Sequence, residues 1–301
     1  VDAMNRGGGE APLRLSTLAA LGAHVGQSWN DAVGLLVLAA ERGEDRARHQ
    51  LRLLSRDADL VRGAATAERA PRDVWRSLAG TIDFGAWSVP PPGAALHASP
   101  DIRLFADFVP PGVGAWLIER ARGKLKRALV YDPVGRRNLA AGTRTNTVAE
   151  FDLADTDLVQ VLLQVRMSAA CGVPVRNMEA PAVLHYEVGE EIVNHYDFVD
   201  PDTPGYAREI AERGERIITF LAYLNDDYGG GETDFPTLGL SHKGRAGDGL
   251  YFVNALPNGG GPDRRMLHAG RPPTSGEKWI VSQFIRDRAA LPAVPRAGGS
   301  T

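Results

Sequence analysis

Apolar side chains recur every three to four residues over 13–87, which is the period of amphipathic helices. The repeating positions are Leu15, Leu18, Ala19 and Ala23 in one segment and Ala32, Leu35, Leu36 and Ala39 in the next. Ser28 stands where a helix N-cap is expected, and Gly43 stands where a glycine with positive φ ends a helix. A further helix is predicted over 45–54. The pattern predicts an all-helical N-terminal region.

Part of this region carries small and aromatic residues at wide spacing, namely Trp29, Ala32, Ala39, Gly43, Ala47 and Leu51. The spacing resembles one unit of the Sel1-like helical repeats. No convincing second copy follows, and a single repeat cannot bury a solenoid face. Two interpretations stay open: a helical cap packed on the next domain, or a module for protein contact or dimerisation.

The segment Val89-Pro90-Pro91-Pro92-Gly93 ends the helical region, because proline lacks the amide proton that helices and central strands need. We therefore predict an N-terminal helical region with its linker over 1–93, a second domain over 94–290 and a C-terminal tail over 291–301. Within the second domain a strand is predicted over 102–108, and helices are predicted over 110–129 and 152–172.

Beyond Pro181 the apolar period falls from about four to about two, the alternation of half-buried strands. Short β-rich runs separated by turn residues cover 182–188, 192–198, 217–224, 232–236, 249–253, 265–269 and 279–285. Many short strands predict an all-β barrel or sandwich. The expected fold class is α+β, with helices flanking the β core and a small all-α region before it.

The charge balance narrows the function classes. With 34 basic and 37 acidic side chains and a net charge of −3, the chain lacks the basic excess of nucleic-acid or membrane-surface binders. Cys171 is the only cysteine, which excludes an intramolecular disulfide and a thiolate metal cage. We find no membrane-spanning run and no signal peptide. We expect a soluble, cytoplasmic protein, with the lack of an initial Met leaving open that upstream residues are missing.

The first candidate chemistry is the run His195-Tyr196-Asp197. Alternate residues of a strand share a face, so the imidazole and the carboxylate point the same way. His268, in a later predicted strand, supplies a third ligand. Two histidines and one carboxylate form the facial triad of non-haem Fe(II) oxygenases. The remaining histidines lack such neighbours and are interpreted as structural or solvent-facing.

Lys278 is the second candidate, on the last predicted strand. Strand parity places Lys278, Ile280, Ser282 and Phe284 on one face. If that face is the interior, a buried lysine is costly unless an anion meets it. The alternative is that Lys278 lies at the start of the strand and reaches water.

Further motifs run through 184–286 in a fixed order. They are Tyr186, His195 with Asp197, Arg216 to Asn225, Gly230 to Pro236, His242 to Asp248, Phe252 with Asn254, and His268 to Trp279. Together they resemble the prolyl 4-hydroxylase branch of the Fe(II)/2-oxoglutarate-dependent dioxygenases. The likeness is weaker over 100–146 and leaves out the N-terminal helices.

This resemblance implies a double-stranded β-helix (jelly-roll) core, with Fe(II) held by His195, Asp197 and His268. Lys278 would pair with the far carboxylate of 2-oxoglutarate, and Tyr186 and Thr233 would be hydroxyl donors around that cosubstrate. It also implies O₂ as a cosubstrate and leaves ascorbate open as a reductant. The expected activity is hydroxylation of an unactivated C–H bond with release of succinate and CO₂, which needs no catalytic side chain beyond the metal ligands.

Four positions bear on the substrate. Arg216 matches a substrate-contacting arginine of the family, whereas Ile192, Phe284 and Arg286 replace an aromatic residue, a tryptophan and a histidine. Two guanidinium groups favour a small carboxylated, amino-acid-like substrate over a long prolyl peptide, because they can hold a carboxylate bidentately. Both kinds of substrate stay open.

Two further functions are alternatives. One is a tailoring hydroxylase acting on an unrelated metabolite. The other, from a different class, is a non-catalytic scaffold or interaction protein. A decayed barrel would be expected to lose at least one of His195, Asp197, His268 and Lys278, and all four are present.

Overall fold

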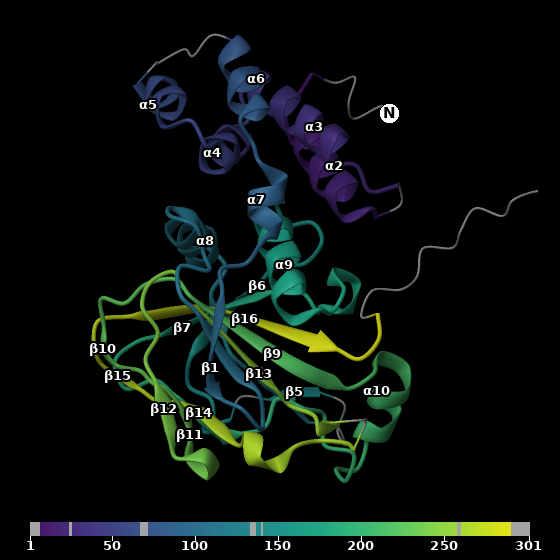
Figure 1. The fold of residues 1–301 in the computed structure, drawn as a ribbon, viewed down its shortest axis with the longest axis vertical. Helices are drawn as coiled ribbons and strands as arrows, with labels where there is room; N and C mark the ends of the chain where they lie inside the picture. The colour runs from purple at the N-terminus through teal and green to yellow at the C-terminus, as the bar shows by residue number, and fades with distance from the viewer. Residues whose placement is uncertain are drawn as a thin grey trace, which may run out of the picture. The chain divides into compact units, whose positions relative to one another are not determined.

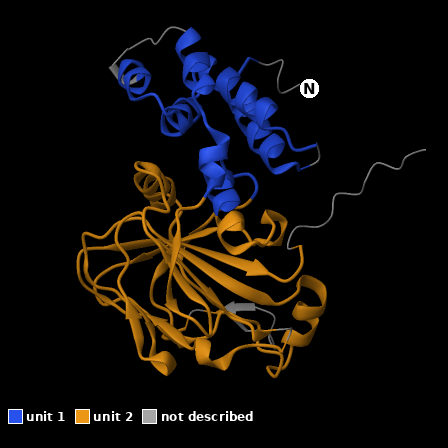
Figure 2. Cartoon of the chain, viewed as in Figure 1, with its two compact units in different colours: residues 1–89, 153–166, 293–301 blue, residues 90–152, 167–292 orange. Residues whose placement is uncertain are grey.

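The structure is a computed structural model that describes residues 7–23, 26–66, 72–132, 137–139, 141–257 and 260–289. His24 and the predicted tail over 291–301 lie outside the described residues. The chain divides into two compact units (Figure 2). Unit 1 comprises residues 1–89, 153–166 and 293–301, and unit 2 comprises residues 90–152 and 167–292. The division thus falls inside the proline-rich segment. Unit 1 also includes the segment 153–166, and no sequence pattern indicates that this segment belongs with the N-terminal helices.

Unit 1 is helical, as predicted (Figure 1). Its elements are α2 (Glu10–Leu21), α3 (Trp29–Glu41), α4 (Asp45–Leu54), α5 (Ala58–Thr66), α6 (Arg72–Gly80), α7 (Phe84–Ser88) and the first part of α9 (Leu158–Cys171). The Ser28 hydroxyl accepts a hydrogen bond from Asp31 N–H at 3.2 Å, which confirms the N-cap of α3. Gly43 follows α3 with φ of +90°. Leu15, one of the repeating apolar positions of α2, is 38% exposed, whereas Leu13 on the same helix is buried.

Helix α9 begins at Leu158, six residues later than its predicted start at 152. Asp157 Oδ1 accepts from Gln160 N–H at 2.9 Å, and Gln160 Oε1 accepts from Asp157 N–H at 3.0 Å. This reciprocal capping box fixes the start of the helix. Gln50 Oε1 accepts from Leu158 N–H, and Thr17 donates to the Thr156 carbonyl, so side chains of α4 and α2 hold the segment within unit 1.

Unit 2 contains two main antiparallel sheets. The larger runs in the order β1 (Gly93–His97), β2 (Ile102–Phe105), β13 (Gly249–Val253), β9 (Arg216–Tyr223), β16 (Lys278–Arg286), β7 (Ala182–Tyr186), β6 (Thr147–Glu150), β3 (Lys126–Arg127). The smaller runs β12 (Leu240–His242), β11 (Thr233–Phe235), β14 (His268–Gly270), β8 (Ile192–His195). Two small pairs join β10 (Gly229–Gly230) with β15 (Pro273–Ser275) and β4 (Val130–Asp132) with β5 (Arg137–Leu139). The helical elements are α8 (Val113–Arg122), α10 (Tyr206–Arg213), and the 3₁₀ turns η1 (Val175–Asn177), η2 (Pro236–Leu238) and η4 (Arg264–Met266).

One apolar core lies between the two main sheets. The larger sheet contributes Leu184, Tyr186, Leu221, Tyr223, Leu250, Phe252 and Ile280, and Phe235 comes from the smaller sheet. Ile280 shares its strand face with Lys278, so that face of β16 is the interior. The jelly-roll expectation is confirmed.

Several predicted boundaries shift where local turns override the apolar pattern. The helix predicted over 110–129 ends at Arg122, because Gly123 follows and β3 begins at Lys126. The strand predicted over 265–269 is a 3₁₀ turn followed by β14. Strands such as β1, β6 and β12 are short and were not predicted from the sequence. They are recognised in the structure by their pairing with neighbouring strands.

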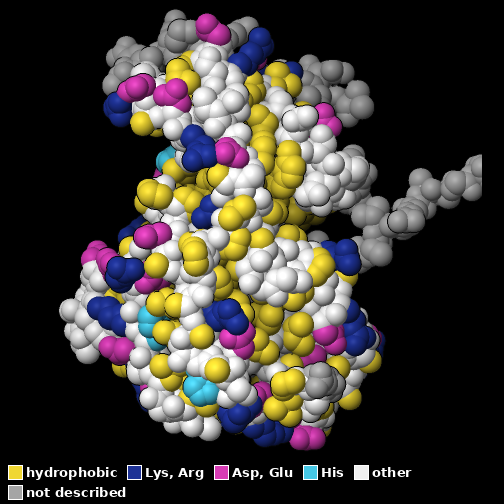
Figure 3. All heavy atoms as spheres, viewed as in Figure 1, with side chains coloured by type: hydrophobic (Ala, Val, Ile, Leu, Met, Phe, Trp, Pro, Cys, Tyr) yellow, Lys and Arg dark blue, Asp and Glu magenta, His cyan; other side chains and the backbone are white. Residues whose placement is uncertain are grey.

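On the face drawn in Figure 3, basic and acidic side chains are interspersed, in keeping with the small net charge. Among the described helices, none combines the length and the apolar character that a bilayer crossing would need.

Candidate active site

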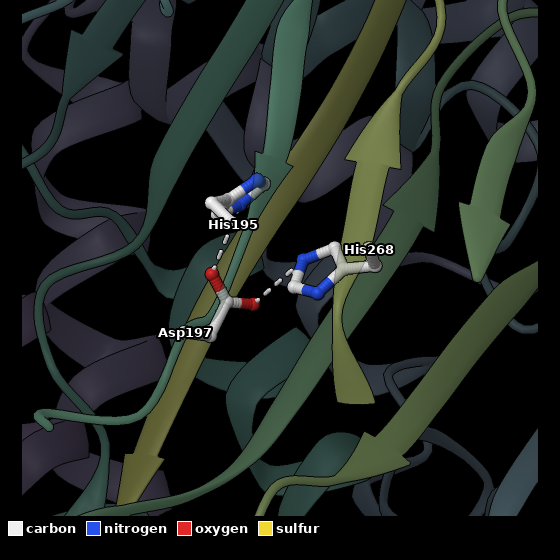
Figure 4. Close-up of side chains that lie close together, drawn as sticks. All are labelled: His195, Asp197 and His268. Carbon is white, nitrogen blue, oxygen red and sulfur yellow. Dashed lines mark ion pairs between the residues drawn. The ribbon is translucent and has the colours of Figure 1, made fainter. Parts of the chain in front are cut away.

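His195, Asp197 and His268 converge (Figure 4). His195 is the last residue of β8, and His268 opens β14 as its antiparallel partner, so the ring centroids are 4.3 Å apart. Asp197 lies two residues beyond the end of β8 rather than within the strand. Its Oδ1 is 3.4 Å from His195 Nε2, and its Oδ2 is 3.3 Å from His268 Nε2. One ligand atom from each side chain lies within 4.8 Å of the others, close enough to share one metal ion.

Backbone carbonyls orient both imidazole rings. His195 Nδ1 lies 2.9 Å from the Val193 carbonyl oxygen, and His268 Nδ1 lies 3.0 Å from that of Met266. A carbonyl can only accept, so each Nδ1 donates to it, and each Nε2 faces Asp197 as the ring atom left for a metal. Metal-binding histidines use this arrangement to fix their tautomer.

The carboxylate of Asp197 is buried and held in its ionised form. Burial alone would raise its pKa, but the adjacent His268 and His195 hold the pKa of Asp197 well below its usual value. Thr219 Oγ1 donates to Asp197 Oδ2 at 2.7 Å, and Asn254 Nδ2 donates to the same hydroxyl oxygen at 2.9 Å. Thr219 and Asn254 were not identified from the sequence as partners of the Asp197 carboxylate. The alternation of β9 was an available signal, because it places Thr219 on the same face as Leu221 and Tyr223 of the core.

Lys278 is fully buried, so the alternative in which it reaches water is wrong. Its Nζ donates to the Gly231 carbonyl at 2.7 Å. Within the described part of the chain, no carboxylate forms an ion pair with this ammonium group, and burial lowers the pKa of Lys278 to about 7 even though Glu232 acts in the opposite direction. An ammonium group buried without a counter-charge among the described residues is costly, which makes Lys278 a candidate anion site in the barrel interior.

Two tyrosine rings lie near the Lys278 ammonium, and one of these tyrosines is hydrogen-bonded to a threonine. Tyr186 is the cross-strand partner of Lys278, and its ring centre lies 5.2 Å from Nζ. Thr233 Oγ1 is hydrogen-bonded at 3.0 Å to the hydroxyl of Tyr223, whose ring centre is 6.0 Å from Nζ. Burial raises the pKa values of both tyrosines, so they stay protonated and able to donate. Tyr223 was not singled out from the sequence.

The two candidate substrate arginines share one carboxylate. Glu179 accepts two hydrogen bonds from Arg216, at 2.7 and 3.0 Å, and one from Arg286 at 2.6 Å. These partners, acting against burial, lower the pKa of Glu179 to about 2. Arg286 is fully buried, and its remaining donors bind Glu209 and the Gly214 carbonyl. The prediction that Arg286 contacts substrate is therefore wrong, because its side chain has no exposed surface and each of its three nitrogens donates to a protein acceptor.

The other two candidate substrate residues lie on different elements. Phe284 is half-buried beneath Arg216, whose guanidinium carbon is 3.8 Å from the centre of its ring. Arg216 retains 25% of its side-chain surface. Ile192 packs against the barrel core and pairs with Gly270. Their roles towards substrate stay predictions.

Comparisons with known proteins agree with this geometry. The family model described as the 2OG-Fe(II) oxygenase superfamily matches residues 181–286. Probable prolyl 4-hydroxylase 9 of Arabidopsis thaliana is 32% identical over 215 residues, covering 65% of this chain and 72% of that protein. Prolyl 4-hydroxylase subunit alpha-1 of Gallus gallus is 30% identical over 189 residues, covering 63% of this chain but 36% of the subunit.

Among solved structures, the viral collagen prolyl hydroxylase of Paramecium bursaria Chlorella virus-1, in its 2OG complex, matches with a TM-score of 0.48 and 26% identity. That match covers 62% of this chain and 95% of the viral chain. Because the Arabidopsis relative is matched over most of its length, the chain belongs to the prolyl 4-hydroxylase-like 2OG-Fe(II) oxygenases, which are dioxygenases that use Fe(II), 2-oxoglutarate and O₂.

Proposed function

We propose that His195, Asp197 and His268 hold the Fe(II) ion. The observation that carries this proposal is the convergence of the two Nε2 atoms and one ionised carboxylate, with each Nδ1 already used by a backbone carbonyl. Such a ligand set occupies one face of an octahedron and leaves three positions open for cosubstrates. When bound, the iron supplies the coupled decarboxylation of 2-oxoglutarate and hydroxylation of a C–H bond.

We propose that the far carboxylate of 2-oxoglutarate pairs with Lys278. Among the described residues, the buried ammonium has only the Gly231 carbonyl as a hydrogen-bond acceptor. Tyr186 is its cross-strand partner, and Thr233 is hydrogen-bonded to the nearby Tyr223. An anion here would restore the charged state of Lys278 and gain charge-assisted hydrogen bonds. The chain thereby orients the cosubstrate and excludes water.

The substrate we propose is a proline residue within a peptide. The expectation of a small carboxylated substrate depended on two free guanidinium groups, whereas both are paired with Glu179, and Arg286 also with Glu209. What remains exposed is the edge of Arg216 stacked on Phe284, a cation–aromatic surface suited to peptide groups. The named relatives are prolyl 4-hydroxylases, which also supports a prolyl substrate.

Turnover on a substrate panel tests this function. We expect prolyl peptides to yield succinate and a product heavier by one oxygen, with EDTA or His268→Ala abolishing both. Free amino acids and small carboxylated metabolites should release no more succinate than a blank. Turnover confined to those small molecules would contradict the peptide proposal and favour a tailoring hydroxylase.

For the N-terminal helices we propose a role in contact with another protein or in dimerisation. A groove of about 690 Å³ within unit 1, lined by Val37 and Leu38 of α3 and Phe84 of α7 among others, supports it. Sedimentation equilibrium of the full chain would test dimerisation: a single species at the monomer mass over a wide concentration range would contradict it.

A further inference from the structure

His242 is the one histidine of the barrel interior to which the proposed function gives no role. It ends β12, and antiparallel pairing sets it directly opposite Thr233 of β11. Directly paired residues project from the same face of a sheet. The imidazole therefore lies beside the Thr233 hydroxyl, on the side of the smaller sheet that adjoins the Lys278 pocket.

Tyr223 holds His242 in that position. Its ring lies edge-on to the imidazole, with 5.9 Å between centroids, while its hydroxyl is hydrogen-bonded to Thr233. Just beyond β12, Gly244 lies flat against the same ring, and a Cβ there would overlap the ring carbons. The backbone that follows β12 thus packs against the ring of Tyr223. One packed group is formed by His242, Thr233 and Tyr223.

The imidazole carries an unused polar atom. His242 Nε2 is buried and has no hydrogen-bond partner among the described residues, unlike the Nδ1 atoms of His195 and His268. Burial, reinforced by the positive charge of Lys278, lowers the pKa of His242 despite the opposing carboxylate of Asp248. The ring is therefore neutral at pH 7 and can donate one hydrogen bond. A buried polar atom left without a partner costs about 1–3 kcal/mol, so a partner is expected.

We propose that His242 Nε2 donates a hydrogen bond to the far carboxylate of 2-oxoglutarate, as a further donor beside Lys278, Tyr186 and Thr233. The inference rests on the proposed function, in which that carboxylate occupies the Lys278 pocket. A carboxylate has about four acceptor positions, more than one ammonium and two hydroxyls fill. This role would replace the interpretation of His242 as structural or solvent-facing.

A competing role is purely structural. The Oδ1 atom of Asp248 is also buried without a partner, and Asp248 interacts electrostatically with His242. An ordered water could bridge the two groups. Under that role His242 would affect folding but would not distinguish a ligand with a far carboxylate from one without it.

The test measures binding rather than turnover, by anaerobic calorimetry on the Fe(II)-loaded full chain. Two probes are compared: 2-oxoglutarate, and 2-oxopentanoate, which keeps the chelating keto acid but has a methyl group in place of the far carboxylate. We expect His242→Phe to weaken 2-oxoglutarate binding about tenfold or more and to leave 2-oxopentanoate binding unchanged. His242→Gln, whose amide can present a donor near the Nε2 position, should recover most of the affinity.

The control is His97→Phe, because His97 is a half-buried histidine of β1 that bonds to the Pro100 carbonyl outside the site. It should change neither affinity. Equal losses for both probes in the His242 variants, or no loss for either, would overturn the inference in favour of the structural role. Lys278→Ala distinguishes a failure of the His242 inference from a failure of the proposed function. If Lys278→Ala weakens 2-oxoglutarate binding while His242→Phe does not, only the His242 inference fails. If Lys278→Ala has no effect, the proposed cosubstrate site itself fails.

Discussion

Among the described residues of unit 2, Lys278 and Arg286 have no exposed side-chain surface, and their partners differ. Arg286 binds Glu179 and Glu209, so the chain itself neutralises its charge. The only hydrogen bond of Lys278 in the described part of the chain goes to the Gly231 carbonyl. A buried charge without a counter-charge is costly, so Arg286 belongs to a structural ion pair, whereas Lys278 is the candidate ligand site.

The pKa of Lys278 predicts a proton linkage. Its value of about 7 in the folded chain is below the usual 10.5, so between those pH values the unfolded state binds more protons and ligand-free stability rises with pH. A bound carboxylate favours the charged amine, so 2-oxoglutarate binding above pH 7 should take up close to one proton, and affinity should fall as pH rises. Calorimetry at pH 8 in buffers of different ionisation enthalpy measures the uptake. Tight binding with no proton uptake, or the same uptake in Lys278→Met, would contradict it.

Glu179 predicts a rise of stability with pH in the same direction, but in an acidic window. Its pKa of about 2 is below the usual 4.5, so its stabilisation is present above pH 4.5 and is lost as pH falls from 4.5 towards 2. Glu179→Gln leaves Arg286 and Arg216 short of a counter-charge and should cost about 3–5 kcal/mol at pH 7. Urea unfolding at pH 7 and pH 3 measures this, and the gap between wild type and variant should narrow at the lower pH. A constant gap would show that the Glu179 charge is not the cause.

At the scale of elements, cross-strand register brings the site together. Pairing of β8 with β14 sets His195 opposite His268, and pairing of β16 with β7 sets Lys278 opposite Tyr186. Shifting either pair by one residue would turn a functional side chain to the other face of its sheet. The capping box of α9 has a similar local effect, since it decides where the buried helix starts.

Asp157 tests that cap. Asp157→Ala removes the acceptor for Gln160 N–H and should destabilise the protein by about 1–2 kcal/mol. Asp157→Asn keeps a side-chain oxygen at the cap and should cost much less. Chemical denaturation of both variants gives the comparison. Equal losses would mean that the charge of Asp157, rather than its capping hydrogen bond, supports this region.

At the scale of the whole molecule, the site joins two sheets. His195 and His268 come from the smaller sheet, whereas Thr219, Tyr186 and Lys278 come from the larger. A metal and a cosubstrate bound by both sheets should therefore stabilise the folded chain, since ligands that bind only the native state shift its equilibrium.

Removal of the ligands measures this coupling. Fe(II) with 2-oxoglutarate at about 100 times its dissociation constant should add about 2.7 kcal/mol under anaerobic conditions. EDTA should reverse the gain, and His268→Ala should show none of it from the metal. A thermal scan with and without each ligand gives the result. An equal gain in His268→Ala would place the metal elsewhere.

The sequence by itself indicated the candidate metal triad and Lys278 from residue types and their spacing, and the jelly-roll class through the family resemblance. Spacing along one chain can be followed without knowing its spatial neighbours, and strand parity placed Lys278 on the same face as Ile280. It also determined the helical character of the N-terminal region, because the period of 3.6 is a local property. The Sel1-like resemblance and the cytoplasmic location stay predictions.

Only the tertiary structure decided what each charged or polar group near the site binds. Arg286 looked like a substrate contact until Glu179, which lies 107 residues away along the chain, was found beside it. His242 gained its place only through pairing with Thr233 and contact with Tyr223. Residue type and spacing set the face on which a side chain lies. The burial of a side chain and its hydrogen-bonding or ionic partners set its charge and the donors it has free. Both burial and partners depend on segments that meet only in the folded chain.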